Sequence, residues 1–192
     1  MTSIPTRFSR SMRAAALAAI AATTGLAAIS AAPAEAGHHK RSKAQANLVE
    51  TAAKSKVHKT LVTAVKAADL VDTLQSPGPF TVFAPTDTAF AKLPNGTVET
   101  LVKPESKATL AKILTYHVTP GRVTASDLVN QINVNGGEYR IPTVAGPVLT
   151  ARLSGDKIII TDGQKRVTAV TRANVSTSNG VIHFTDGVFL PG

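Results

Sequence analysis

Apolar residues recur with a helical period through the first half of the chain. The clearest stripe occupies positions i, i+3, i+4 and i+7 and consists of Leu110, Ile113, Leu114 and His117. A second stripe consists of Val57, Leu61, Val65 and Ala68, after a shorter helix that begins near Leu48. Pro120-Gly121 ends the helix of the first stripe. We therefore expect several helices here, with His117 facing the core and Tyr116 presenting its hydroxyl near the surface.

Short strands and turns dominate the second half. One strand comes early, at Phe80-Thr81-Val82-Phe83, and apolar and polar residues alternate again from Val148 to Leu153. Further strands are expected at 157–161, 167–170, 181–184 and 188–190. Asn135-Gly136-Gly137 predicts a hairpin turn, with Ile132 and Val134 in the strand before it. Helices first and strands later predict an α+β domain containing a β-sandwich or barrel.

The N-terminal segment has the features of an export signal. Arg7, Arg10 and Arg13 precede an uncharged, Ala-rich run that ends at Ala34-Glu35-Ala36. This pattern is typical of a secretory signal peptide over residues 1–36, and a retained membrane anchor is the alternative. Residues 37–46 form a basic, mobile segment in this interpretation, and residues 47–192 form the domain. We expect the protein to be secreted to the periplasm, cell surface or medium.

The composition limits which classes of partner and which kinds of chemical site are possible. The 192-residue chain carries a formal net charge of +9 and contains no cysteine, which excludes disulfides, thiolate metal sites and cysteine nucleophiles. A basic exported protein suits an anionic partner, although solubility alone also explains the charge. Aromatic residues make up only 4% of the chain, so few side chains are available for nucleic-acid bases to stack on. No specific nucleic-acid binding is therefore expected.

No sequence motif indicates catalysis. Nucleophile-elbow, zinc-protease and phosphate-loop patterns are absent, and the carboxylates are scattered, so we expect neither an enzyme nor a cofactor. One metal site is conceivable at a mature N-terminus. Gly37, His38 and His39 could offer Cu(II) or Ni(II) a square-planar set of nitrogen ligands. An incidental polar terminus is the preferred interpretation.

Three segments resemble the conserved blocks of fasciclin domains. The first block is Thr81-Val82-Phe83-Ala84-Pro85-Thr86-Asp87-Thr88-Ala89-Phe90, the second is the pair Tyr116-His117, and the third runs from Asn179-Gly180 to Pro191. Their order and spacing agree with single-domain secreted bacterial members. The resemblance implies a wedge-shaped β-sandwich with several helices packed on one side. It also implies an apolar residue, often aromatic, where this chain has His58.

The blocks also supply candidate site residues. In animal relatives the Tyr-His region is implicated in partner binding, which suggests Tyr116 and His117 here. Physically, the remaining block residues look structural. We interpret Thr86 and Asp87 as helix caps, Phe90 as core, Asn179-Gly180 as a turn with positive φ, His183 as a neutral core histidine, and Asp186-Gly187 as a second turn or bulge.

The resemblance implies roles in cell adhesion and contact with matrix or surfaces. The leading hypothesis is therefore non-catalytic binding to a protein, glycan or lipid of a cell surface or matrix. A single domain crosslinks surfaces poorly unless it dimerises or docks on the envelope, so a weak homo-oligomer is also expected. The alternatives are a periplasmic or extracellular ligand-binding or signalling protein for a small apolar or anionic molecule, and an enzyme built by spatial convergence of His117, His183 and a carboxylate.

Overall fold

The structure, a computed structural model, describes residues 45–192. The export signal and most of the basic segment lie outside these residues. Its helices are α1 (Leu48–Lys54), α2 (Lys59–Ala67), α3 (Val71–Gln75), α4 (Asp87–Ala91), α5 (Thr97–Leu101), the 3-10 turn η1 (Pro104–Ser106), α6 (Lys107–Tyr116) and α7 (Ala125–Val134). Its strands are β1 (Phe80–Pro85), β2 (Val118–Pro120), β3 (Glu138–Ile141), β4 (Leu149–Ser154), β5 (Lys157–Thr161), β6 (Val167–Thr177) and β7 (Gly180–Thr185).

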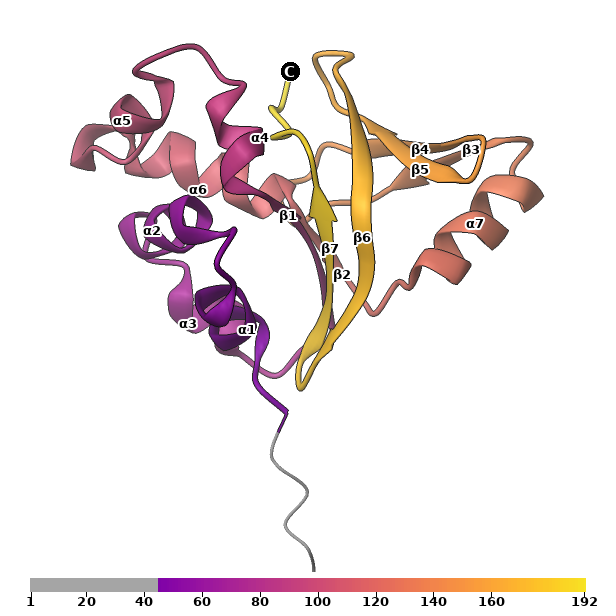
Figure 1. Ribbon diagram of the computed structural model, residues 1–192, viewed down its shortest axis with the longest axis horizontal. Coiled ribbons are helices and arrows are strands. Elements are labelled where there is room, and N and C mark those ends of the chain that lie inside the picture. Colours follow the sequence, from indigo (N-terminus) through magenta and orange to yellow (C-terminus); the bar gives the residue numbers. More distant parts are fainter. Residues whose placement is uncertain (1–44) are drawn as a thin grey trace, which may run out of the picture. The chain divides into compact units, whose positions relative to one another are not determined.

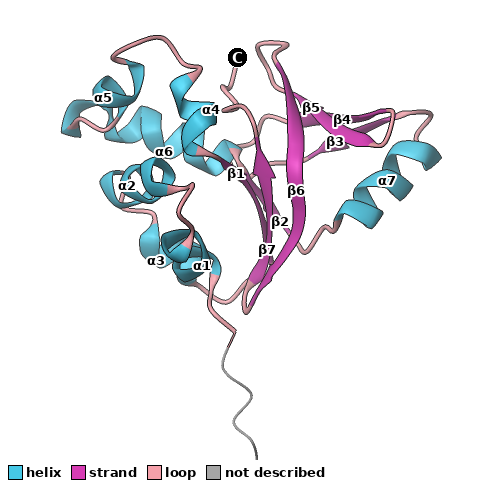
Figure 2. Ribbon diagram, viewed as in Figure 1, coloured by secondary structure: helices cyan, strands magenta, loops and turns pink. Residues whose placement is uncertain are grey.

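The strands form one continuous sheet of seven strands in the order β2-β1-β7-β6-β5-β4-β3. All neighbours are antiparallel except β1 and β7, which run parallel from Phe80↔Gly180 to Pro85↔Thr185. The chain therefore places its first and last strands side by side at the centre of the domain (Figures 1 and 2). The α+β class is confirmed.

Two apolar cores lie on the two faces of β1 and β7. Side chains alternate along a strand, so Ala84 and Ile182 face helices α1 to α6, whereas Phe83 faces the other way. On that second side Phe83 shares a core with Leu128 of α7 and Ile160 of β5. The two ends of the sheet thus enclose a common core in the manner of a sandwich, while helices α1 to α6 cover one face.

Three local expectations were wrong. Ile132 and Val134 belong to the last turn of α7, and Asn135-Gly136-Gly137 ends that helix where a hairpin was expected. Residues 188–190 form no strand and are held instead by side chains, as described below. Val57 precedes α2 and is 46% exposed, so it does not belong to the buried stripe.

The helix caps explain two of the helix starts. Asn47 and Glu50 form a reciprocal capping box at α1, and Thr124 and Asp127 form another at α7. None of the helices within residues 45–192 is long and apolar enough to cross a bilayer.

Candidate functional site

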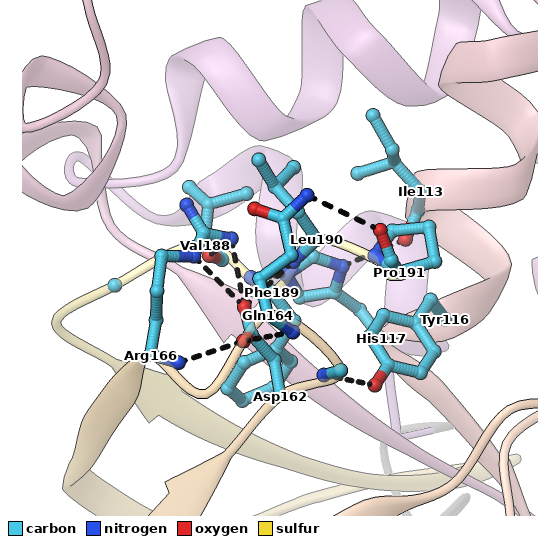
Figure 3. Close-up of polar contacts among 12 residues, drawn as sticks. Ile113, Tyr116, His117, Asp162, Gln164, Arg166, Val188, Phe189, Leu190 and Pro191 are labelled. Atoms are coloured by element: carbon cyan, nitrogen blue, oxygen red, sulfur yellow. Dashed lines mark hydrogen bonds and ion pairs between the residues drawn. The ribbon is translucent and has the colours of Figure 1, made fainter.

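Tyr116 and His117 lie where α6 ends and β2 begins. Tyr116 is the last residue of α6 and His117 is its C-cap, and they are 0% and 2% exposed. Figure 3 shows both side chains beside the C-terminal residues 188–191 and the turn between β5 and β6. The burial predicted for His117 from the helical stripe is confirmed.

His117 joins the end of α6 to the C-terminal segment. Its Nδ1 donates to the carbonyl of Ile113 at 2.8 Å, and its Nε2 accepts from the backbone N–H of Phe189 at 2.9 Å. A carbonyl only accepts and an amide N–H only donates, so the ring is the neutral tautomer with its proton on Nδ1. The ring also stacks on Phe189, with centroids 4.8 Å apart.

This environment keeps His117 uncharged. Complete burial lowers its pKa from 6.5 to about 4. The Ile113 carbonyl and the Asp162 carboxylate raise the pKa and the Arg166 charge lowers it, each by less than burial does. At neutral pH both ring nitrogens are occupied, so the imidazole has no free atom for a substrate, a metal ion or a partner.

Tyr116 is buried to its hydroxyl, which corrects the expectation of a surface hydroxyl. The hydroxyl donates to the carbonyl of Val148 and accepts from the backbone N–H of Gly163, both at 3.0 Å. Burial raises the pKa of Tyr116, against the lowering effect of the Gly163 N–H. Tyr116 therefore connects α6 to two loops of the sheet and is not presented to a partner.

Asp162, which we missed as a site residue, organises the turn after β5. Its Oδ1 accepts from the N–H groups of Gln164 (3.0 Å) and Arg166 (2.9 Å), and its Oδ2 accepts from the N–H of Leu190 (3.0 Å). The Arg166 guanidinium binds Oδ2 at 2.7 Å and also donates to the carbonyl of Val188 at 2.9 Å. Asp162 and Arg166 are four residues apart, and this i,i+4 spacing of opposite charges was the signal in the sequence.

His183 lies at one end of a row of buried rings, and His117 lies at the opposite end. Its Nε2 donates to the carbonyl of Val123 at 2.9 Å, and its Nδ1 accepts from the N–H of Asn174 at 3.4 Å. The ring stacks on Phe83, which contacts Phe189 edge-to-face. Burial lowers the pKa of His183. A neutral, hydrogen-bonded core histidine was the favoured interpretation, and the contacts agree with it.

Asp87 is a helix cap, but for a helix other than its own. Its carboxylate accepts from the backbone N–H groups of Lys59 (3.3 Å) and Thr60 (2.8 Å), so it caps α2. Those hydrogen bonds lower the pKa of Asp87, although burial acts in the opposite direction and is the largest single influence. Thr86 occupies the N-cap position of α4 without a side-chain cap bond, so the expected role of its hydroxyl was wrong. That hydroxyl contacts Thr88 at 2.8 Å.

Asn179 ties three segments together. Its Oδ1 accepts from the N–H of Leu48, and its Nδ2 donates to the carbonyls of Leu74 (2.8 Å) and Ser76 (3.0 Å). The sequence predicted a turn with positive φ at Asn179-Gly180, but the φ of Gly180 is not positive. Gly180 is required for another reason. A Cβ at Gly180 would lie 2.0 Å from the carbonyl oxygen of Phe80, so only glycine permits the parallel contact of β1 and β7.

The remaining block residues are also structural in their contacts. Phe90 is 9% exposed and packs in the core under the helices. Asp186 accepts from the N–H of Ala169 at 2.8 Å and pairs at the surface with Lys92. The chain bends at Asp186 and Gly187, and a Cβ at Gly187 would meet the Thr168 hydroxyl at 2.6 Å.

Comparison with known proteins agrees with the three blocks. The sequence profile described as "Fasciclin domain" matches residues 56–191. The chain belongs to the fasciclin family. It is 49% identical over 144 residues to protein sll1483 of Synechocystis sp., covering 75% of this chain and 73% of that one. It is 46% identical over 146 residues to protein sll1735 of the same organism, covering 76% and 98%.

More distant fasciclin proteins match over shorter shares of their length. Immunogenic protein MPB70 of Mycobacterium bovis is 33% identical over 123 residues, which cover 64% of this chain and 55% of that one. A solved FAS1 domain pair from the insect cell adhesion molecule fasciclin I has a TM-score of 0.66 at 20% identity, over 77% of this chain and 51% of that chain. This likeness confirms the fasciclin fold.

His58 departs from the apolar residue that the resemblance implies, yet it is packed as an aromatic ring. It is 1% exposed and meets Phe184 edge-on, with centroids 4.3 Å apart. Its Nδ1 contacts the Ser55 hydroxyl at 2.7 Å, while its Nε2 has no hydrogen-bond partner among residues 45–192. Burial lowers the pKa of His58, with smaller raising effects from the Ala84 carbonyl and Asp87.

The signature residues of this fasciclin domain therefore hold the fold together and form no open reaction centre. His117 and His183 lie at the two ends of the row His183, Phe83, Phe189 and His117, all buried. Residues 45–192 contain no group of three or more His, Asp or Glu side chains that could hold a metal ion. Gly37, His38 and His39 lie outside the described residues, so the copper or nickel site stays a prediction.

Proposed function

We propose that this fasciclin domain is exported and contacts a cell-surface or matrix component by binding, without catalysis. The observation that carries the proposal is the burial of Tyr116, His117 and His183, whose polar atoms are occupied by the protein's own backbone. A partner must therefore meet the outer face of the domain. The solved structure with the same fold comes from a protein named a cell adhesion molecule, which supports adhesion as the kind of contact.

The partner is a protein, glycan or lipid exposed on a cell surface or in a matrix. One domain offers one contact, so useful attachment requires a weak homo-oligomer or docking on the cell envelope. The excess of Lys and Arg over Asp and Glu favours approach to negatively charged surfaces, which is a rate effect that salt weakens.

Binding of a small apolar molecule, as a ligand-binding or signalling protein, is less well supported. An apolar cavity lies between helices α1 and α2 and the sheet, lined by residues such as Leu61, Val82 and Ile182, but its volume is about 40 Å³. Sites for drug-sized ligands measure roughly 300–1,000 Å³. The cavity would have to expand several-fold, so surface contact remains the better proposal.

Deletion of the gene tests the proposed function. Attachment of cells to a defined surface should fall in the deletion strain and return when the purified exported protein is added. Mass spectrometry of that protein should place its first residue near Gly37. Unchanged attachment after deletion would count against the adhesion role.

A further inference from the structure

We propose that the groove between α7 and strands β5 and β6 binds an extended peptide segment of a protein partner, which adds to the sheet beside β6. The groove has a volume of about 820 Å³ and is lined on its helical side by Ala125, Ser126, Val129 and Asn130. This inference rests on the proposed function, because it names the face of the domain that makes the contact.

The floor of the groove is an open strand edge. Pairing of β5 with β6 stops at Ile159 and Ala169, whereas β6 continues to Thr177 with β7 as its only strand neighbour among residues 45–192. Beyond the groove this edge is covered, because the Asn174 side chain accepts from the N–H of Ala125 at 2.8 Å. The uncovered stretch is 170–173. An uncovered edge offers backbone N–H and C=O groups to an added strand.

Small side chains leave room for that strand. Ala169 and Ala173 of β6 and Ala125 of α7 line the groove, and each contributes only a methyl group to its wall. Figure 1 shows α7 below β3 to β5 on the right, with the long strand β6 to the left of both. The volume falls within the roughly 300–1,000 Å³ that is typical of ligand sites.

Charge favours a peptide over an anionic polymer. The ionisable residues that line the groove are Asp156, Asp186 and Lys157, so the lining carries two carboxylates and one ammonium group. Asp186 already pairs with Lys92, while Asp156 makes no ion pair within the described residues. The lining therefore offers an acidic polysaccharide or a phospholipid headgroup no net positive charge to bind. A peptide with Lys or Arg placed opposite Asp156 is complementary.

Nuclear magnetic resonance titration of the purified protein tests the site. The probe is a peptide of about ten residues, with alternating valine and threonine and lysine at both ends; a second probe carries glutamate at the ends. We expect the lysine probe to shift the amide signals of residues 170–173. Asn130→Trp, which fills the groove from an exposed position of α7, should weaken binding about tenfold or more. Asp156→Asn should remove the preference for lysine over glutamate.

Gln131→Trp is the matched control, because Gln131 is the next exposed residue of α7 and does not line the groove. Equal weakening by both tryptophan variants, no shifts at residues 170–173, or the same shifts with polygalacturonate would overturn the site. The attachment assay separates the two proposals. Attachment that survives Asn130→Trp contradicts the groove and leaves the adhesion role standing, whereas failure of the unaltered protein to support attachment contradicts the adhesion role even if the peptide binds.

Discussion

The Nε2 atom of His117 accepts a hydrogen bond from the backbone N–H of Phe189, 2.9 Å away, and the two rings stack. These residues belong to the second and third conserved blocks, which are far apart in the sequence. The pair fastens the C-terminal segment, which lacks a strand partner within residues 45–192, against the end of α6. The nearby bonds of Tyr116 and Asp162 fasten the same region.

His117→Ala should lower the free energy of unfolding by about 1–3 kcal/mol. The variant leaves the buried Phe189 N–H and Ile113 carbonyl without their side-chain partner. Urea unfolding followed by circular dichroism measures the change. Lys112→Ala, at an exposed position of the same helix, should stay within about 0.5 kcal/mol of the original protein. Equal stability of both variants would refute the structural role of His117.

The free energy of unfolding should decrease as the pH is lowered from about 6.5 to about 4. The pKa of His117 is lower in the folded state than the ordinary 6.5, so the unfolded chain binds the proton more readily in this range. The contribution of neutral His117 to the free energy of unfolding is fully present above pH 6.5. It is lost as the pH approaches 4, which lowers the free energy of unfolding by up to about 3 kcal/mol. The lowered pKa values of His58 and His183 act in the same direction. Urea unfolding at several pH values should show this slope, and His117→Ala should reduce it.

Asp162→Asn should destabilise the protein by about 2–3 kcal/mol. The carboxylate is fully buried, but the Arg166 side chain is 36% exposed, so solvent screens part of the ion pair. Hydrogen exchange at the Leu190 amide, which donates to Asp162, should accelerate more than exchange in β4. Asp156→Asn is the exposed control and should leave both quantities unchanged.

Gly180→Ala should cost about 3 kcal/mol or more, because its Cβ would overlap the Phe80 carbonyl where β1 and β7 begin to pair. Gly136→Ala provides the comparison. Gly136 has a φ of +75° and open space around its Cα, so alanine there meets only backbone strain of about 1–2 kcal/mol. Thermal unfolding midpoints should rank the two variants in this order. A milder effect at Gly180 would contradict the close approach of β1 and β7.

Local patterns predicted the elements that depend on local contacts. The stripe that ends in His117 located α6 and its buried face, and the alternation from Val148 to Leu153 located β4. The same reasoning failed at Asn135-Gly136-Gly137, because glycine after asparagine can end a helix as readily as it turns a hairpin. Thr124 and Asp127, three residues apart, were the overlooked sign that a helix begins there.

Side-chain partners across the chain could not be predicted in this way. Asp87 caps α2, whose first residues lie 27 and 28 positions earlier in the sequence, and Tyr116 is covered by a turn 47 positions later. Periodicity reports which face of α6 is apolar, but not that the C-terminal segment packs against His117 at the end of that face. The groove beside β6 depends likewise on where β5 stops pairing, which no sequence pattern marked.

The central claim is that Tyr116 and His117 act inside the fold and not at a partner. Attachment promoted by Tyr116→Phe protein tests it most directly, because this variant removes the hydroxyl that contacts Val148 and Gly163 but keeps the ring. Stability should drop by about 1–2 kcal/mol, while attachment per folded molecule should equal that of the original protein. A folded Tyr116→Phe protein that no longer promotes attachment would contradict the account.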